Sequence, residues 1–170
     1  MKLLITHEEI VEISKRLGKE ITEKFQGKVP IVVCVLKGAS PFHSELIKHI
    51  DLMMDIDFLQ VSSYSGGTQS TGVLHFKKDL ELDIKDRDVI IVEDIVDTGL
   101  TLSKLKEELY NRKPSSLTFV TLLDKPSKRK HDFKPDIIGK TIDDLFVIGF
   151  GLDLDEKYRN LKDIYIYDQD

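Results

Sequence analysis

The chain of 170 residues contains no tryptophan and only one cysteine, Cys34. A lone cysteine excludes an internal disulfide, and with scattered histidines it excludes a thiolate-based zinc site. No apolar run is long enough to cross a bilayer, and the N-terminal segment turns acidic too soon for a secretory signal. We therefore expect a cytoplasmic protein without a membrane partner, in which Cys34 is a small buried side chain of a strand.

A positive net charge is missing as well. Lysine and arginine together number 25 against 30 acidic residues, so the net charge is −5. Broad binding to duplex nucleic acid needs a basic face, so we expect no nucleic-acid partner. A local basic pocket for a small phosphorylated molecule remains compatible with this charge. The length suits one domain, residues 1–170, because no repeat or low-complexity linker divides the chain.

Apolar runs of strand length alternate with amphipathic segments. The runs "PIVVCVL" (30–36) and "DVIIVED" (88–94) are typical of strands that helices cover on both faces. Further strands are expected at 54–64, 73–82, 116–124, 146–153 and 164–168, and helices at 7–26, from Ser40 and at about 101–111. This alternation predicts an α/β fold with a central, mostly parallel sheet flanked by helices.

Ligand sites of such sheets lie at the carboxyl ends of the strands. The polar clusters that follow Leu36, Val92, Leu123 and Leu152 are therefore expected to converge on one site.

The segment "VEDIVDTGLT" (92–101) follows one of these strands and leads into a predicted helix. A helix N-terminus has unpaired backbone N–H groups and a partial positive charge. Gly99 lets the backbone approach a ligand, and Thr98 and Thr101 add hydroxyl groups, so the turn is typical of a phosphate site. The Gly-Lys-Ser/Thr of a Walker A loop is missing, and so is the dinucleotide-binding GxGxxG.

Two carboxylates, Glu93 and Asp94, stand immediately before this turn. They would repel a phosphate unless ribose hydroxyls or Mg²⁺ lay between, so the combination suggests a sugar phosphate with a metal ion. Alternatively, both acids cap the following helix or form salt bridges. A receiver-like phosphoacceptor domain would also place acids at a strand end, but it would not explain the Thr-Gly-Leu-Thr turn.

The stretch "VIIVEDIVDTGLTL" (89–102) resembles the PRPP-binding motif of type I phosphoribosyltransferases. Four more segments match the hypoxanthine(-guanine) phosphoribosyltransferases in the same order: "VLKGA" (35–39), "SSYSGGTQSTG" (62–72), "LLDKPSKR" (122–129) and "FVIGFGLDLDEKYRNL" (146–161). The resemblance covers about residues 7–167. The last two segments are specific to the 6-oxopurine branch, and the final one looks like its bacterial members.

The resemblance implies a purine salvage enzyme that uses Mg²⁺. It would transfer the 5-phosphoribosyl group of PRPP to N9 of hypoxanthine, and of guanine, giving IMP or GMP and pyrophosphate. It also implies a type I phosphoribosyltransferase fold with a small hood from about residues 1–10 and 130–170, a mobile loop at about 63–75, and a homodimer or homotetramer. The sequence does not rank hypoxanthine, guanine and xanthine as substrates.

The resemblance also assigns roles to single residues. Asp97 would be the catalytic base that accepts the proton of purine N7. The ribose and 5′-phosphate of PRPP would contact Glu93, Asp94, Asp97, Thr98, Gly99, Leu100 and Thr101. Pyrophosphate would contact Lys37, Gly38, Ser63, Tyr64 and Arg159, beside a cis peptide between Leu36 and Lys37. The purine base would contact Ile95, Lys125, Phe146, Val147 and Asp153, with Lys125 at O6 and Phe146 stacked on the ring. Mg²⁺ would be held by Glu93, Asp94 and Asp153.

Plainer interpretations exist for several of these positions. Lys37 would otherwise be a surface lysine, Phe146 and Val147 core residues of a strand, and 62–72 a hairpin connection. Arg129 matches a family position near the pyrophosphate and O6. A regulatory relative that binds nucleotides or RNA on the same fold should carry a basic face, whereas this chain is acidic and keeps Asp97, Lys125 and Asp153.

Overall fold

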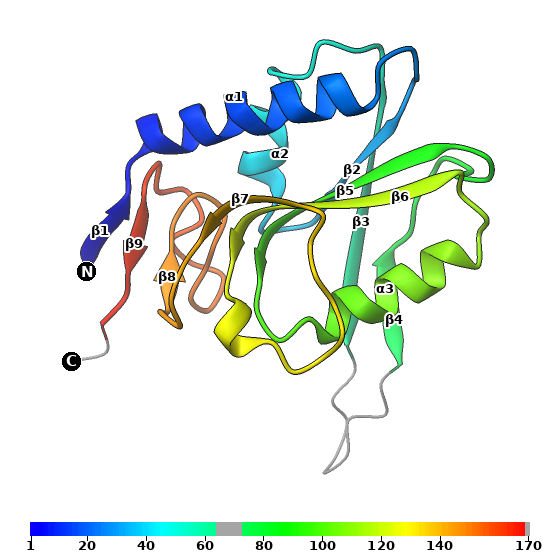
Figure 1. Cartoon of the computed structure of the whole chain (residues 1–170). Coiled ribbons are helices and arrows are strands. Elements are labelled where there is room, and N and C mark those ends of the chain that lie inside the picture. Colours follow the sequence, from blue (N-terminus) through cyan, green and yellow to red (C-terminus); the bar gives the residue numbers. More distant parts are fainter. Residues whose placement is uncertain (64–72, 169–170) are drawn as a thin grey trace.

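The computed structural model describes residues 1–63 and 73–168, whose arrangement is shown in Figure 1. The helices are α1 (His7–Lys24), α2 (Ser40–Ile47), α3 (Leu100–Tyr110) and a short 3₁₀ helix, η1 (Pro126–Lys128). The strands are β1 (Lys2–Ile5), β2 (Ile31–Val35), β3 (Asp55–Ser63), β4 (Leu74–Lys78), β5 (Asp88–Val96), β6 (Ser116–Asp124), β7 (Ile137–Thr141), β8 (Val147–Ile148) and β9 (Ile164–Ile166). None of these helices is long and apolar enough to cross a membrane.

The central sheet has six strands in the order β4-β3-β2-β5-β6-β7. Every neighbouring pair is parallel except β3 and β4, which are antiparallel. Helices α1 and α2 lie on one face of the sheet and α3 lies on the other (Figure 1). The predicted α/β fold with a mostly parallel sheet is therefore confirmed.

The continuous apolar runs of β2 and β5 bury both of their faces. On β5, Ile90 and Val92 pack in the core cluster of α1 and α2, while Val89 and Ile91 pack in the cluster of α3. Cys34 pairs with Val92 in the sheet register and is fully buried. Burial raises the pKa of the Cys34 thiol to about 12, with the carboxylates of Glu93 and Asp94 adding to the rise. The cysteine is thus a core residue rather than a reactive thiol.

A second, three-stranded sheet, β1-β9-β8, joins the two ends of the chain. It corresponds to the expected hood, but β7 pairs with β6 in the central sheet, so this small sheet takes only β8 and β9 from the C-terminal part. The predicted strand 146–153 is wrong after Ile148, because Gly149, Phe150 and Gly151 all have positive φ and turn the chain. His7 N–H donates to Asp163 Oδ1 at 2.7 Å and ties the start of α1 to the hood.

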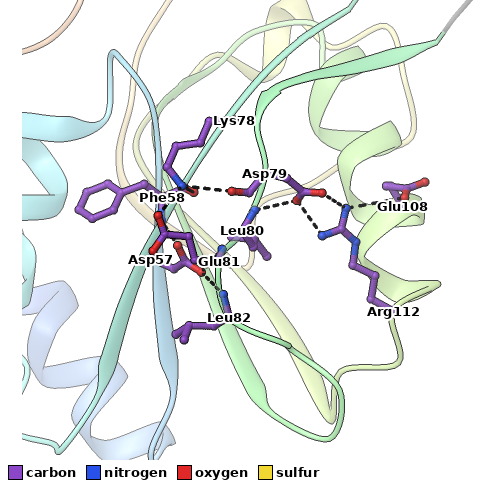
Figure 2. A network of polar contacts seen from close by, with 9 residues as sticks. All are labelled: Asp57, Phe58, Lys78, Asp79, Leu80, Glu81, Leu82, Glu108 and Arg112. Atoms are coloured by element: carbon purple, nitrogen blue, oxygen red, sulfur yellow. Dashed lines mark hydrogen bonds and ion pairs between the residues drawn. The ribbon is translucent and has the colours of Figure 1, made fainter.

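The edge of the central sheet is fastened by a polar network (Figure 2). The buried Asp57 on β3 accepts backbone hydrogen bonds from Glu81 at 3.0 Å and Leu82 at 2.9 Å, which hold the segment after β4. Asp79 accepts two hydrogen bonds from Arg112, at 2.7 and 2.9 Å, just beyond the C-terminus of α3. Strand β4 is thereby fixed to both β3 and α3. The expected loop at 63–75 lies mostly outside the described residues, although 74 and 75 already belong to β4.

Candidate active site

The carboxyl ends of β2 and β5 lie side by side, because these strands are parallel neighbours in the sheet, and the polar residues that follow them meet as the strand pattern predicted. They surround a cavity of about 350 Å³. Its lining includes Gly38, Glu93, Asp94, Ile95, Asp97, Thr98, Gly99, Leu100, Thr101, Asp153 and Arg159. A neighbouring pocket of about 190 Å³ shares Asp94, Ile95, Asp97 and Asp153 with this cavity and adds Lys125, Phe146, Val147 and Leu152. Sequence segments 38, 93–101, 125 and 146–159 are thus brought together.

The turn at the end of β5 presents a free helix N-terminus to the larger cavity. Gly99 is the N-cap of α3, with φ of 82°, and no side chain of the described part of the chain caps this helix. Leu100 N–H donates to the Thr98 hydroxyl oxygen at 3.4 Å. The other N–H groups of the first turn, which an α-helix leaves without an internal partner, suit an anion, as a phosphate site requires. The interpretation of Glu93 and Asp94 as helix-capping acids is wrong, because no side-chain cap bond is present at the start of α3.

Glu93 and Asp94 lie near the C-terminal end of β5 and form a pair of partly buried carboxylates. Burial is the main cause that raises the pKa of both groups, and for Glu93 the negative charge of Asp94 raises the pKa further. Arg159 counteracts the rise for Asp94. The pair is packed closely against the loop after β2, because a Cβ on Gly38 would lie 2.0 Å from Asp94 Oδ2.

This carboxylate pair fits a divalent cation that is shared with a substrate. Two adjacent acids that resist ionisation gain most from a positive charge placed beside them. Across residues 1–63 and 73–168, no three histidine, cysteine or acidic side chains gather closely enough to hold a metal by themselves. Mg²⁺ characteristically uses one or two carboxylates together with substrate phosphates, so the residues suit this ion when a phosphorylated ligand is bound.

Glu156 contacts two of the residues predicted to bind pyrophosphate, Lys37 and Arg159. The peptide between Leu36 and Lys37 is cis, as expected. Lys37 Nζ lies 2.8 Å from Glu156 Oε2, and Arg159 Nη2 lies 3.3 Å from Glu156 Oε1. Arg159 Nη1 also approaches Asp153 Oδ1 at 3.0 Å. Glu156 thus contacts both predicted pyrophosphate-binding cations. In the sequence, only its place in the acidic segment "DLDE" (153–156) could have indicated this role.

The smaller pocket has a cation at its inner end and an aromatic ring at its mouth. Lys125 is 5% exposed, and its Nζ lies 3.3 Å from Asp97 Oδ1. Phe146 is 50% exposed, which makes it a poor core residue and a ready surface for stacking. Val147 begins β8 and Leu152 lines the same pocket. A flat ring that carries a carbonyl group would match both the ammonium group and the aromatic ring.

Three other residues with predicted roles are not among the described lining residues of either cavity. The Ser63 hydroxyl lies 3.4 Å from the Thr101 hydroxyl, which brings the end of β3 to the phosphate turn. Tyr64 lies outside the described residues. Arg129 lines neither of the two pockets, and its guanidinium pairs with Asp124 instead.

Comparisons with known proteins identify the family of the chain. Residues 3–156 match the family model "Phosphoribosyl transferase domain". A hypoxanthine-guanine phosphoribosyltransferase of Bacillus subtilis is 51% identical over 160 residues, which are 94% of this chain and 89% of the relative. The crystal structure of a hypoxanthine phosphoribosyltransferase from Staphylococcus aureus superposes with a TM-score of 0.95 at 49% identity, covering 99% of this chain and 91% of that one.

A hypoxanthine-guanine phosphoribosyltransferase structure from Bacillus anthracis gives a TM-score of 0.93 at 42% identity and covers 98% of both chains. These matches cover nearly the whole chain. The chain therefore belongs to the phosphoribosyltransferase family, in its hypoxanthine-guanine branch.

Proposed function

We propose that this enzyme transfers the 5-phosphoribosyl group of PRPP to N9 of hypoxanthine and guanine, giving IMP or GMP and pyrophosphate. The observation that carries this proposal is the contact of Asp97 with Lys125 where the two cavities adjoin. One cavity offers a phosphate turn and acids, while the other offers an ammonium group and an aromatic ring. A purine in the smaller pocket would present N7 and O6 to this pair.

The Lys125 ammonium supports selection of 6-oxopurines. An ammonium group only donates hydrogen bonds, so it is complementary to the lone pairs of O6 and not to the hydrogens of a 6-amino group. Because Lys125 is buried, adenine would leave its charge without an acceptor, at a cost of about 1–3 kcal/mol or more. Phe146 would stack on the ring, and the backbone of Val147 would meet the base edge.

Asp97 is the group that we assign as general base. When N9 bonds to C1 of the ribose and pyrophosphate departs, the purine must lose the proton of N7. Asp97 is about half exposed into the cavity and lies next to the ammonium that would hold O6, so its carboxylate can accept this proton. The same carboxylate neutralises Lys125 before the purine binds.

The larger cavity accommodates the PRPP half of the reaction. The turn Asp97–Thr101 and the N-terminus of α3 would bind the 5′-phosphate, and Glu93 with Asp94 would accept the ribose hydroxyls. Lys37, the Gly38 backbone, Ser63, Tyr64 and Arg159 would hold the leaving pyrophosphate. Mg²⁺, held by Glu93, Asp94 and Asp153 with substrate oxygens, would supply positive charge beside the pyrophosphate.

The remaining parts of the proposal concern the cellular setting. We infer a homodimer or homotetramer in the cytoplasm, without nucleic acid or membrane as partner. The single cysteine is buried and unpaired, as is usual in a reducing compartment, which supports the location.

A spectrophotometric assay with PRPP and Mg²⁺ tests the function. Hypoxanthine and guanine should be converted and adenine should not, with xanthine measured beside them. Absence of turnover with every 6-oxopurine would contradict the proposal. Size-exclusion chromatography with light scattering at assay concentration tests the oligomer, and a monomer would overturn that part alone.

A further inference from the structure

The ion pair between Asp124 and Arg129 adjoins residues that line the two cavities: Asp124 precedes Lys125, and the Arg129 side chain lies against Gly99. Asp124 ends β6 and is 4% exposed, and Arg129 Nη2 contacts its Oδ1. Arg129 Nη1 also donates to the Phe133 carbonyl oxygen at 3.2 Å. The pair closes a loop of the chain around Lys125 and η1. Separating a buried pair of this kind is costly, because either partner left alone would be an uncompensated buried charge. The pair therefore holds the two ends of this loop together.

The segment held by this pair rests on the phosphate turn. The backbone N–H groups of Lys130 and His131 both donate to the Thr98 carbonyl oxygen, at 3.0 and 3.1 Å. The Arg129 side chain lies against Gly99, where an added Cβ would come within 2.9 Å of Arg129 Cδ. Figure 1 shows the chain after η1 passing the N-terminal end of α3. The Arg129 side chain thus packs against the turn and lines neither cavity.

The other end of the same loop positions the purine-side lysine. The Lys125 backbone N–H donates to the Val96 carbonyl oxygen at 3.0 Å, just before Asp97. Its side chain then reaches Asp97 Oδ1. The residues between Asp124 and Arg129 therefore include the predicted O6 donor, and the segment after Arg129 supports the predicted 5′-phosphate turn.

We propose that Asp124 and Arg129 are positioning residues that hold Lys125 and the Thr98–Gly99 turn at a fixed separation, matched to a molecule with a 6-oxopurine at one end and a 5′-phosphate at the other. Arg129, which matches a family position near the pyrophosphate and O6, would then act through the backbone rather than by touching a ligand. The proposal rests on the proposed function, since it uses the roles assigned to Lys125 and to the turn.

The test compares GMP, which spans the two ends, with pyrophosphate, which does not. Asp124→Asn keeps an oxygen acceptor for Arg129 and removes the charge, so it is the variant of choice; Arg129→Met removes the other partner. Both should weaken GMP binding by about tenfold or more and lower kcat/KM for hypoxanthine by about ten- to a hundredfold. Pyrophosphate binding, measured by calorimetry with Mg²⁺, should change by less than about twofold.

Lys128→Met is the matched control. Lys128 lies in the same loop, and its ion pair with Asp144, at 3.1 Å, is exposed, so its loss should leave both ligands unaffected. Arg129→Lys keeps the charge but loses the planar fork, and it should restore GMP affinity in part. The double variant Asp124→Asn/Arg129→Met should be no worse than the poorer single variant, because one pair is broken in all three.

Each alternative outcome is distinct. If Arg129 were a direct ligand, Arg129→Met would weaken pyrophosphate binding while Asp124→Asn would not. If the pair were only structural, the melting temperature would fall and the affinity of the folded fraction for GMP would stay unchanged. Either result would overturn the positioning role. Absence of turnover by the unaltered protein would instead contradict the proposed function.

Discussion

Lys125 Nζ lies 3.3 Å from Asp97 Oδ1, so the buried cation of the smaller pocket has as its counter-ion a residue that also lines the larger cavity. The two side chains differ in exposure, 6% for Lys125 and 48% for Asp97. In the proposed function, Asp97 would turn toward an arriving purine, while Lys125 would stay in place and bind O6 instead of the carboxylate. In the absence of substrate, the two opposite charges neutralise each other.

Asp97→Asn should lose most of the catalytic rate while PRPP still binds. General base catalysis contributes about 10²–10⁴-fold, and an amide cannot accept the N7 proton. Stopped assays for kcat and calorimetry for PRPP measure the two effects separately. Asp155→Asn, a change in an exposed acid outside both cavities, is the control. Full activity of Asp97→Asn would show that another group takes the proton.

Lys125→Met should weaken binding of hypoxanthine more than binding of PRPP. The variant removes the O6 donor and keeps an apolar stem of similar length, and a hydrogen bond to a charged group contributes about 1.5–3 kcal/mol. The expected result is a rise of about ten- to a hundredfold in KM for hypoxanthine. Discrimination against adenine should shrink as well. Equal loss of affinity for both substrates would contradict the O6 role.

Glu93→Gln should stabilise the protein in the absence of ligand and abolish tight PRPP binding. The pKa of Glu93 is raised in the folded state, mainly by burial, so ionised Glu93 destabilises the fold. This destabilisation is absent below the ordinary glutamate pKa of 4.5 and develops as the pH rises toward the raised pKa. The stability gain, about 0.5–2 kcal/mol, should therefore appear at neutral pH and vanish near pH 4.

Thermal melting of both proteins across this pH range, without Mg²⁺ or PRPP, measures the effect. A gain that is equal at both ends of the range would mean that the charge of Glu93 is not its cause. Glu12→Gln is a suitable control, because Glu12 is an exposed acid of α1 in a surface pair with Lys15.

Glu156→Gln should tighten pyrophosphate binding. Glu156 contacts Lys37 at 2.8 Å and Arg159 at 3.3 Å, so it occupies the two cations that pyrophosphate is expected to need. Both contacts are exposed to solvent, and such pairs contribute about 0–1 kcal/mol, so the gain should be about two- to fivefold. Calorimetry with pyrophosphate and Mg²⁺ measures it. Weaker binding to the variant would show that Glu156 supports the site rather than competing for it.

The elements that the sequence predicted well are those with long local signals. The eighteen residues of α1 repeat their apolar side chains with helical spacing, and Thr6 and Glu9 form a capping box at its start. Strand β2 is apolar along its length, and β5 and β6 are mostly apolar, because both of their faces are covered. Strands β1 and β7 were not predicted, since four or five residues carry too little periodicity to be distinguished from a loop.

By itself, the sequence determined the alternation of strands and helices and the phosphate turn after β5, because periodicity and turn residues act over neighbouring positions. Its motifs also carried the resemblance that indicated the purine. Only the tertiary structure decided which side chains pair across distant segments, such as Lys125 with Asp97 and Glu156 with Lys37, and that Arg129 turns back to Asp124 across its own loop. Such pairs depend on strand order and on the path of the loops, which no local pattern encodes.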